Sequence, residues 1–155
     1  MEHQSKVSVA ISSMRFEEGR TEYLLQQRAR EPFAGYIGLL TGKVLRGETI
    51  DEAAARILEE ETGLSADFHV VAIKHKMDYD CEDKLLEDKF FFVVRASNIS
   101  GPFKREFERG VNLWMSVGEL EKTPHIFDGV EDALHWLHAP QLTFREVKHQ
   151  ASDCA

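Results

Sequence analysis

The first stretch of the chain alternates between apolar and polar residues. Val7, Val9 and Ile11 are separated by a serine and an alanine, and this period of two predicts a half-buried strand. Residues 17–19 form a predicted turn, after which residues 21–28 (TEYLLQQR) return as an antiparallel partner. The chain therefore opens with a hairpin that should join a sheet.

Helical spacing replaces this alternation in the stretch TIDEAAARILEEETG. Thr49 and Glu52 make a capping box at its start, and Gly63 suits its end. One face of this helix is apolar and should pack on a core. The residues on that face are Ile50, Ala54, Ile57 and Leu58.

Strands are expected on both sides of this helix. A short apolar strand within residues 31–41 leads into Gly42. Residues 66–76 and 89–96 follow as strands, the second of them covered on both faces. The acid-rich connection between these two strands is expected to be a solvated loop.

The last third of the chain continues this pattern of alternating elements. The expected elements are a loop over residues 98–110, a strand over residues 111–117 and a short helix over residues 118–122. A last helix should begin at Asp128, which suits an N-cap, and run through His138 to its stop at Pro140. Residues 141–155 are expected to begin as a short strand and then to fray.

Three consecutive glutamates, Glu59, Glu60 and Glu61, lie in the last turn of the central helix. Each carboxylate costs about 0.3–1 kcal/mol there, because this is the negative end of the helix dipole. At about 100° per residue, Glu60 and Glu61 fall on adjoining faces and Glu59 turns away. Their oxygens suit Mg²⁺ or Mn²⁺, since Mg²⁺ takes one or two carboxylates plus water and substrate phosphates. The alternative interpretation is a solvated acidic helix end.

The residues around these glutamates resemble the signature of a known family. The Nudix hydrolases, or MutT-type pyrophosphohydrolases, share a box written G-x5-E-x7-R-E-U-x-E-E-x-G-U, in which U is aliphatic. The residues that match it in register are Gly42, Glu48, Arg56, Leu58, Glu60, Glu61, Gly63 and Leu64. The remaining defined position, a glutamate in the family, is Ile57.

The resemblance implies an α/β fold, the Nudix-type α/β/α sandwich with a mixed β-sheet. It implies that Glu60 and Glu61 are catalytic residues and metal ligands, and that Gly42 offers a backbone carbonyl near the metal. Arg56 is expected to hold the box together as part of the catalytic set. Arg28, at the end of its strand, is expected to contact substrate phosphates.

The resemblance leaves the general base open. Family members commonly carry an acid just before a strand tryptophan, which corresponds to Trp114, but residues 111–113 hold no acid. Glu61, Glu106 and Glu108 are the candidates. For the last two, simple solvation in the loop is the alternative.

Composition bounds the organisation of the chain. Its 155 residues with 43% hydrophobic content are enough for one domain, residues 1–155, that buries its own core. The expected core spans about residues 7–138, while residues 1–5 and 148–155 are expected to be loose. The formal net charge of -8 disfavours binding of long nucleic acid, which normally needs a basic surface.

The cysteines and the apolar runs bear on location. Cys81 and Cys154 are too few and too far apart to suggest a disulfide framework or a zinc site. No stretch has the pattern of a signal peptide or the length of a membrane span, so we expect a cytoplasmic protein without a membrane partner.

Two functions remain open from the sequence. The first, implied by the resemblance, is metal-dependent hydrolysis of the diphosphate linkage in a nucleoside diphosphate linked to another group, which makes a small phosphorylated metabolite, a nucleotide, the expected partner. The second is a catalytically weakened nucleotide-binding or sensor module, suggested by Ile57 and by the missing acid before Trp114. The sequence names neither the substrate nor the oligomeric state, and a homodimer stays open.

Overall fold

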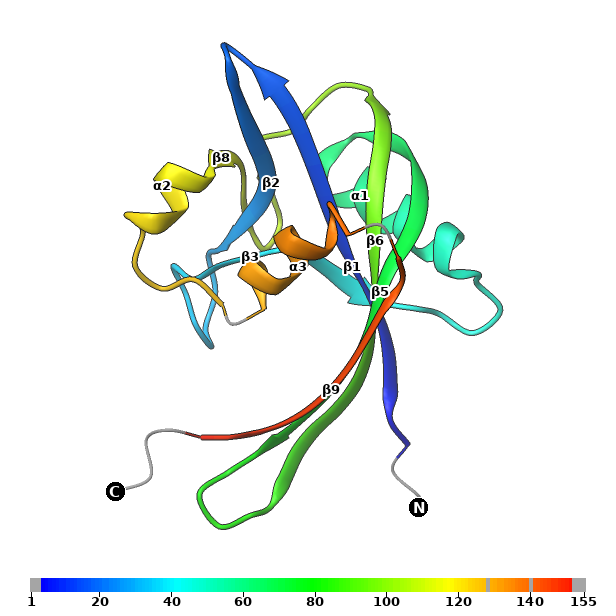
Figure 1. Ribbon diagram of the computed structural model, residues 1–155, viewed down its shortest axis with the longest axis vertical. Helices are drawn as coiled ribbons and strands as arrows, with labels where there is room; N and C mark the ends of the chain where they lie inside the picture. The colour runs from blue at the N-terminus through cyan, green and yellow to red at the C-terminus, as the bar shows by residue number, and fades with distance from the viewer. Residues whose placement is uncertain (1–3, 128, 140, 152–155) are drawn as a thin grey trace.

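Nine strands form one mixed sheet in the computed structural model, which describes residues 4–127, 129–139 and 141–151. The strands are β1 (Lys6–Glu17), β2 (Arg20–Arg28), β3 (Ile37–Gly38), β4 (Leu40–Lys43), β5 (Ser65–Tyr79), β6 (Leu85–Ser100), β7 (Glu106–Phe107), β8 (Gly110–Ser116) and β9 (Thr143–Gln150). The helices are α1 (Ile50–Thr62), α2 (Val117–Glu121) and α3 (Val130–Trp136). Figure 1 shows α1 and α3 on opposite sides of the sheet.

The sheet runs in the order β7-β8-β2-β1-β6-β5-β9, with β3 paired to β2 and β4 paired to β1. Strand β1 is the centre of this arrangement, because it pairs antiparallel with β2 and β4 and parallel with β6. The predicted α/β class with a mixed sheet is confirmed.

Alternate residues of β1 explain the layered architecture. Val9 and Ile11 join the core cluster that packs under α1, whereas Ala10 joins a second cluster with Trp136 of α3. Neighbouring side chains of a strand point to opposite faces, so both faces of the sheet are covered. The prediction of a half-buried first strand is therefore wrong, and Ser12 is fully buried.

The predicted caps of α1 are present. The hydroxyl of Thr49 accepts the backbone N–H of Glu52 at 3.1 Å, and Gly63 adopts a left-handed conformation with φ 76°. Lys104, from the loop after β6, donates its ammonium to the carbonyl of Glu60 at 3.0 Å. A cation at this end of the helix offsets part of the cost of the three glutamates.

The long hairpin of β5 and β6 corrects the predicted connection between them. Asp78 lies in β5, and Glu87 and Asp88 lie in β6, so much of the predicted acidic loop is strand. Figure 1 shows this hairpin projecting from the body with β9 beside it. These three carboxylates are half-buried and lie in ion pairs, Asp78 with Lys76, Glu87 with Lys89 and Asp88 with His75, so they are not simply solvated.

The expectations for the end of the chain are corrected as well. Residues 143–150 form β9, which pairs parallel with β5 from Ala72 to Tyr79, so this segment is not frayed. Strand β6 continues to Ser100, and β7 interrupts the predicted loop. Helix α3 ends at Trp136, before the predicted end at His138. The predicted helix cap at Asp128 and stop at Pro140 lie outside the described residues.

The structure also describes one of the two cysteines and the apolar character of the helices. Cys81, in the turn between β5 and β6, is disulfide-bonded, which its sequence spacing did not predict. Cys154 lies outside the described residues. Every helix among the described residues falls short of the length and apolar character that a membrane span requires.

Candidate active site

A cavity of about 760 Å³ lies where α1, α3 and the ends of several strands meet. The five site residues predicted from the sequence all line it, although they come from three separate elements. These residues are Arg28, Gly42, Arg56, Glu60 and Glu61. The fold therefore brings the proposed phosphate-binding, loop and helix residues to one site.

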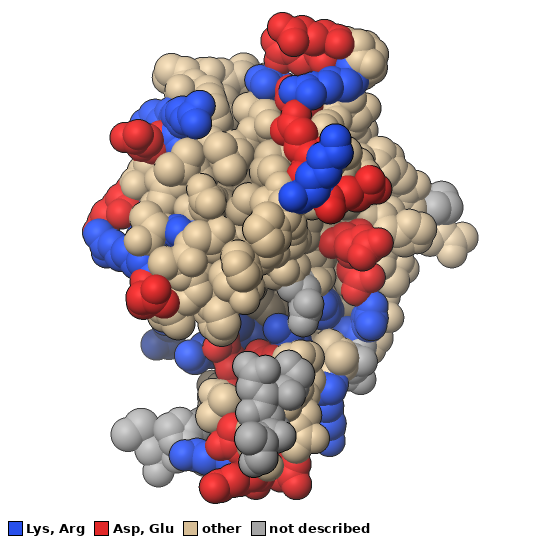
Figure 2. Space-filling view, turned by 90° about the vertical axis from the view of Figure 1, so that its left-hand side faces the viewer, with Lys and Arg blue, Asp and Glu red and all other residues tan. Residues whose placement is uncertain are grey.

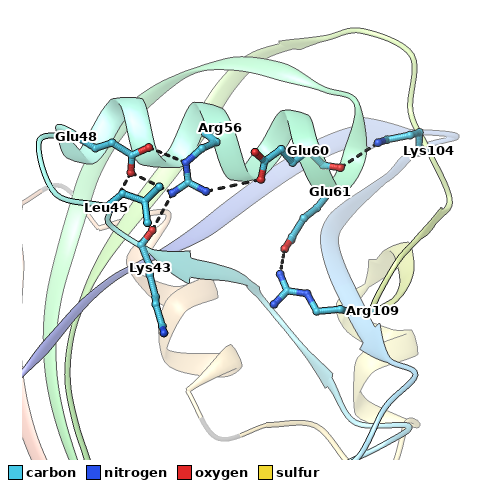
Figure 3. A network of polar contacts seen from close by, with 8 residues as sticks. All are labelled: Lys43, Leu45, Glu48, Arg56, Glu60, Glu61, Lys104 and Arg109. Carbon is cyan, nitrogen blue, oxygen red and sulfur yellow. Dashed lines mark hydrogen bonds and ion pairs between the residues drawn. The ribbon is translucent and has the colours of Figure 1, made fainter.

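Arg56 clamps the loop before α1 to the helix. Its Nε donates to Oε1 of Glu48 at 2.6 Å, and its Nη2 donates both to Oε2 of Glu48 at 3.0 Å and to the carbonyl of Lys43 at 2.9 Å (Figure 3). The backbone N–H of Leu45 donates to the same carboxylate at 2.8 Å. The hydrogen bonds from Arg56 and Leu45 hold the pKa of Glu48 below its ordinary value. The Arg56–Glu48 pair is bidentate, so it fixes the position of the loop relative to the helix better than a single exposed hydrogen bond would.

The two glutamates proposed as metal ligands differ in their surroundings. The carboxylate of Glu61 is 9% exposed and is held from two sides, by Nη2 of Arg109 at 2.5 Å and by Nε2 of Gln26 at 2.8 Å. Glu60 is exposed, and its Oε2 lies 3.7 Å from Nη1 of Arg56. Figure 3 shows Glu60 turned along the helix toward Arg56 and Glu61 turned away from the helix toward Arg109.

Asn112 of β8 supports Glu61, and sequence analysis did not find this role. Its side chain is almost fully buried and donates to the carbonyl oxygens of Glu61 and Lys104, each at 2.8 Å. Its Oδ1 accepts the amide of Gln26 at 3.0 Å. Gln26 of β2 lies directly opposite Asn112 of β8, so only the strand register reveals this network.

The turn between β7 and β8 presents an arginine where an acid was sought. Arg109 lines the cavity together with Phe107. Glu106 and Glu108, the proposed alternative bases, are exposed and are absent from the described lining of the cavity. Glu108 instead lies 3.8 Å from Arg30. Sequence analysis looked in this region for an acidic residue that could act as the base, so it passed over Arg109.

The lining of the cavity is richer in basic than in acidic side chains, although the whole chain is acidic. Its basic residues are Arg28, Lys43, Arg56, Lys74, Lys76, Lys89 and Arg109. Its acidic residues are Glu60, Glu61, Asp78 and Glu87. Figure 2 shows basic side chains where the body meets the projecting arm. A local excess of positive charge favours an anionic ligand.

The donor set near the helix end suits a hard divalent cation. Among the described residues, no three His, Cys, Asp or Glu side chains are grouped as a ready metal cluster. Glu60, Glu61 and the backbone of Gly42 nevertheless line the same cavity. Two carboxylates fit an ion that takes its other ligands from water and phosphate, so the residues present are compatible with Mg²⁺ or Mn²⁺.

Comparison with known proteins identifies the family of this chain. The family model of the NUDIX domain matches residues 5–138. An 8-oxo-dGTP diphosphatase from Haemophilus influenzae is 33% identical over 115 residues, covering 74% of this chain and 79% of that protein.

Solved structures share the fold. A MutT NUDIX hydrolase from Burkholderia pseudomallei is 25% identical, with a TM-score of 0.70 over 87% of this chain and 99% of that one. The NUDIX domain of Shewanella oneidensis NrtR, solved with ADP ribose, is 15% identical, with a TM-score of 0.71 over 87% of each chain.

Proposed function

The chain belongs to the Nudix family and is a Nudix pyrophosphohydrolase, and from this premise we propose that it cleaves the diphosphate linkage of a nucleoside diphosphate linked to another group, with the help of Mg²⁺ or Mn²⁺. The observation that carries this proposal is the shared cavity, in which Glu60 and Glu61 lie among basic side chains. The relative named for 8-oxo-dGTP and the fold neighbour solved with ADP ribose support a nucleotide ligand.

The residues of the cavity have separate roles in this proposal. Glu60 and Glu61 would hold the cation, and the backbone carbonyl of Gly42 would be a further ligand. Arg56 positions these groups, because its bidentate pair with Glu48 ties the loop to the helix and its hydrogen bond to the carbonyl of Lys43 ties the end of β4 to both. When bound, the cation neutralises phosphate oxygens and lowers the pKa of a water molecule.

Arg28 is the proposed phosphate contact at the other wall of the cavity. Its Nε donates to the carbonyl of Pro32 at 3.0 Å, which fixes one end of the guanidinium. The other nitrogens of an arginine fork can bind phosphate oxygens in pairs. Glu61 is the proposed base in preference to Glu106 and Glu108, because it alone of the three lines the cavity.

A paired substitution tests the metal site. Glu61→Gln should weaken Mn²⁺ binding at least about tenfold, a loss of about 1.4 kcal/mol. Glu59→Gln is the matched control, because Glu59 is exposed on the same helix turn and outside the described lining of the cavity. Equal effects of the two substitutions on Mn²⁺ affinity would refute the assignment. Circular dichroism should show that both variants stay folded.

A substrate panel tests the reaction. Nucleoside triphosphates, nucleotide sugars, ADP-ribose and dinucleoside polyphosphates should be assayed with and without Mn²⁺, with product nucleotide measured by chromatography. We expect cation-dependent turnover of at least one class and loss of this turnover in Glu61→Gln. Binding of a nucleotide without turnover by any class would favour the sensor interpretation.

A further inference from the structure

Arg109 combines a fixed backbone with an exposed side chain. It lies in the two-residue turn that joins Phe107 to Gly110, which are paired across β7 and β8. Its carbonyl accepts the backbone N–H of Ala29 at 2.9 Å. Its side chain is 63% exposed and yet reaches the carboxylate of Glu61. The guanidinium can therefore exchange partners without a change in the strand framework.

Arg109 makes the direct ion pair with Glu61, and Arg56 adds a Coulombic attraction to the same carboxylate. Gln26 donates to Oε2 of Glu61, but an amide carries no net charge. The ion pair to Oε1 is the one that the described residues provide for this carboxylate. A carboxylate that is taken out of water needs such a partner. The guanidinium of Arg109 thus occupies Oε1, the oxygen that a bound cation would otherwise share.

We infer that Arg109 is a counter-cation that competes with the divalent ion for Glu61 and moves to a phosphate of the substrate when both bind. This inference rests on the proposed role of Glu61 as a metal ligand. A guanidinium at 2.5 Å from Oε1 repels a second cation at the same carboxylate. A phosphate in the cavity that Arg109 lines offers it a new acceptor.

The consequence is coupling between the cation and the substrate. Without a phosphate ligand, Arg109 stays on Glu61 and the cation binds weakly. With a phosphate ligand, Arg109 leaves Glu61 and the cation binds more tightly. Because such coupling is reciprocal, the cation also strengthens binding of the phosphate. The enzyme would then assemble its charged site only around a substrate.

The test is a titration with Mn²⁺ alone, followed by the electron paramagnetic resonance signal of the free ion. Arg109→Gln should tighten Mn²⁺ binding about two- to fivefold, the upper part of the range expected for loss of one partly exposed ion pair. Arg109→Lys keeps the charge and should bind Mn²⁺ within about twofold of the wild type. Arg30→Gln is the matched control, since it removes an exposed arginine from Glu108 of the same turn.

The phosphate arm uses methylenediphosphonate, which resists hydrolysis. At saturating Mn²⁺, Arg109→Gln should bind this probe about three- to tenfold more weakly than the wild type, measured by calorimetry. Arg30→Gln should bind it as the wild type does. Unchanged binding of the probe by Arg109→Gln would overturn the transfer of Arg109 to phosphate.

Glu61→Gln separates the two proposals. If it does not weaken Mn²⁺ binding, the proposed metal site fails and the competition fails with it. If it weakens Mn²⁺ binding but Arg109→Gln leaves the affinity unchanged or lowers it, only the competition is overturned. The double variant completes the cycle, because Arg109→Gln should have no effect on Mn²⁺ affinity once Glu61 is neutral.

Discussion

Ile57 of α1 packs directly against Gly42 of β4. A β-carbon added at Gly42 would collide with the Cδ1 and Cγ1 atoms of Ile57. Ile57 is 3% exposed and belongs to the core cluster under α1. The contact lets the backbone of β4 approach the helix that carries Glu60 and Glu61. Glycine is needed here for close approach and not for an unusual backbone angle.

Gly42→Ala should therefore lower the free energy of unfolding by about 1–3 kcal/mol, because the extra methyl overpacks a filled core. Chemical denaturation measures this loss. Gly118→Ala in α2 is the control, since its nearest neighbour would be an ordinary contact at 3.9 Å. Ile57→Val removes the Cδ1 atom that collides, so it should restore part of the loss in the double variant. Additive losses would argue against the contact as the cause.

Ile57→Glu should destabilise the protein by several kcal/mol, because it buries a carboxylate in an apolar cluster. Ile57→Gln should lower the melting temperature similarly, since it also places a polar group there. We expect Mn²⁺ to leave the difference between the two melting temperatures unchanged. Neither variant should gain activity.

The opposite outcome for Ile57→Glu has a clear signature. Recovery of stability in Mn²⁺ by the glutamate variant alone, together with faster turnover, would show that the position borders the cation. The cavity includes Ile57 in its lining, so the measurement has to be made in both chelator and Mn²⁺. The present packing supports the core interpretation.

The local elements of the fold were predictable because their signals lie close together in the chain. The Thr49–Glu52 cap, the Gly63 stop and the apolar face with Ile57 are contained within one helix and its ends. The resemblance likewise implied that Arg56 would hold the box together, as its pair with Glu48 does. Such features depend on backbone periodicity and capping chemistry, which a single sequence contains.

The missed features depend on pairing between distant segments. The short strand predicted after residue 141 extends to Gln150 as β9, because it pairs parallel with β5, about 70 residues earlier in the chain. Asn112 reaches Glu61 because β8 pairs with β2, and Arg109 reaches it because of the adjoining turn. None of these contacts leaves a periodic signal in the local sequence. Net charge likewise gives no sign of the basic lining of the cavity, because it averages over the whole chain.

The Glu48–Arg56 pair should make stability depend on pH in the acid range. Hydrogen bonds from Arg56 and Leu45 lower the pKa of Glu48 from 4.5 in the folded state. The contribution of this pair is therefore complete above the unfolded pKa of 4.5 and is lost as the pH falls through the lower folded pKa. Urea unfolding of the wild type and Glu48→Gln should show a gap that narrows below about pH 4.5.

Arg56→Gln provides the check on this assignment. It removes the main hydrogen-bond donor to Glu48, so its own stability should lose pH dependence in the same window. The double variant Glu48→Gln with Arg56→Gln should be little less stable than either single variant, because both act on one pair. A constant gap between wild type and Glu48→Gln at all acid pH values would contradict the pair as the cause.

Asn112→Ala should cost about 1–3 kcal/mol of stability, because it leaves buried carbonyl oxygens at Glu61 and Lys104 without their donor. Asn112→Asp restores an acid near Trp114, as in the resembled family, but puts a carboxylate oxygen against those two carbonyl oxygens. Burial and this repulsion should raise the pKa of the new carboxyl group above its unfolded value. The aspartate variant should therefore be less stable at pH 8 than at pH 5 relative to wild type, whereas the alanine variant should show the same deficit at both. Equal deficits for the aspartate variant at the two pH values would mean that the carboxylate finds another donor, and the network of Asn112 would not be what excludes an acid here.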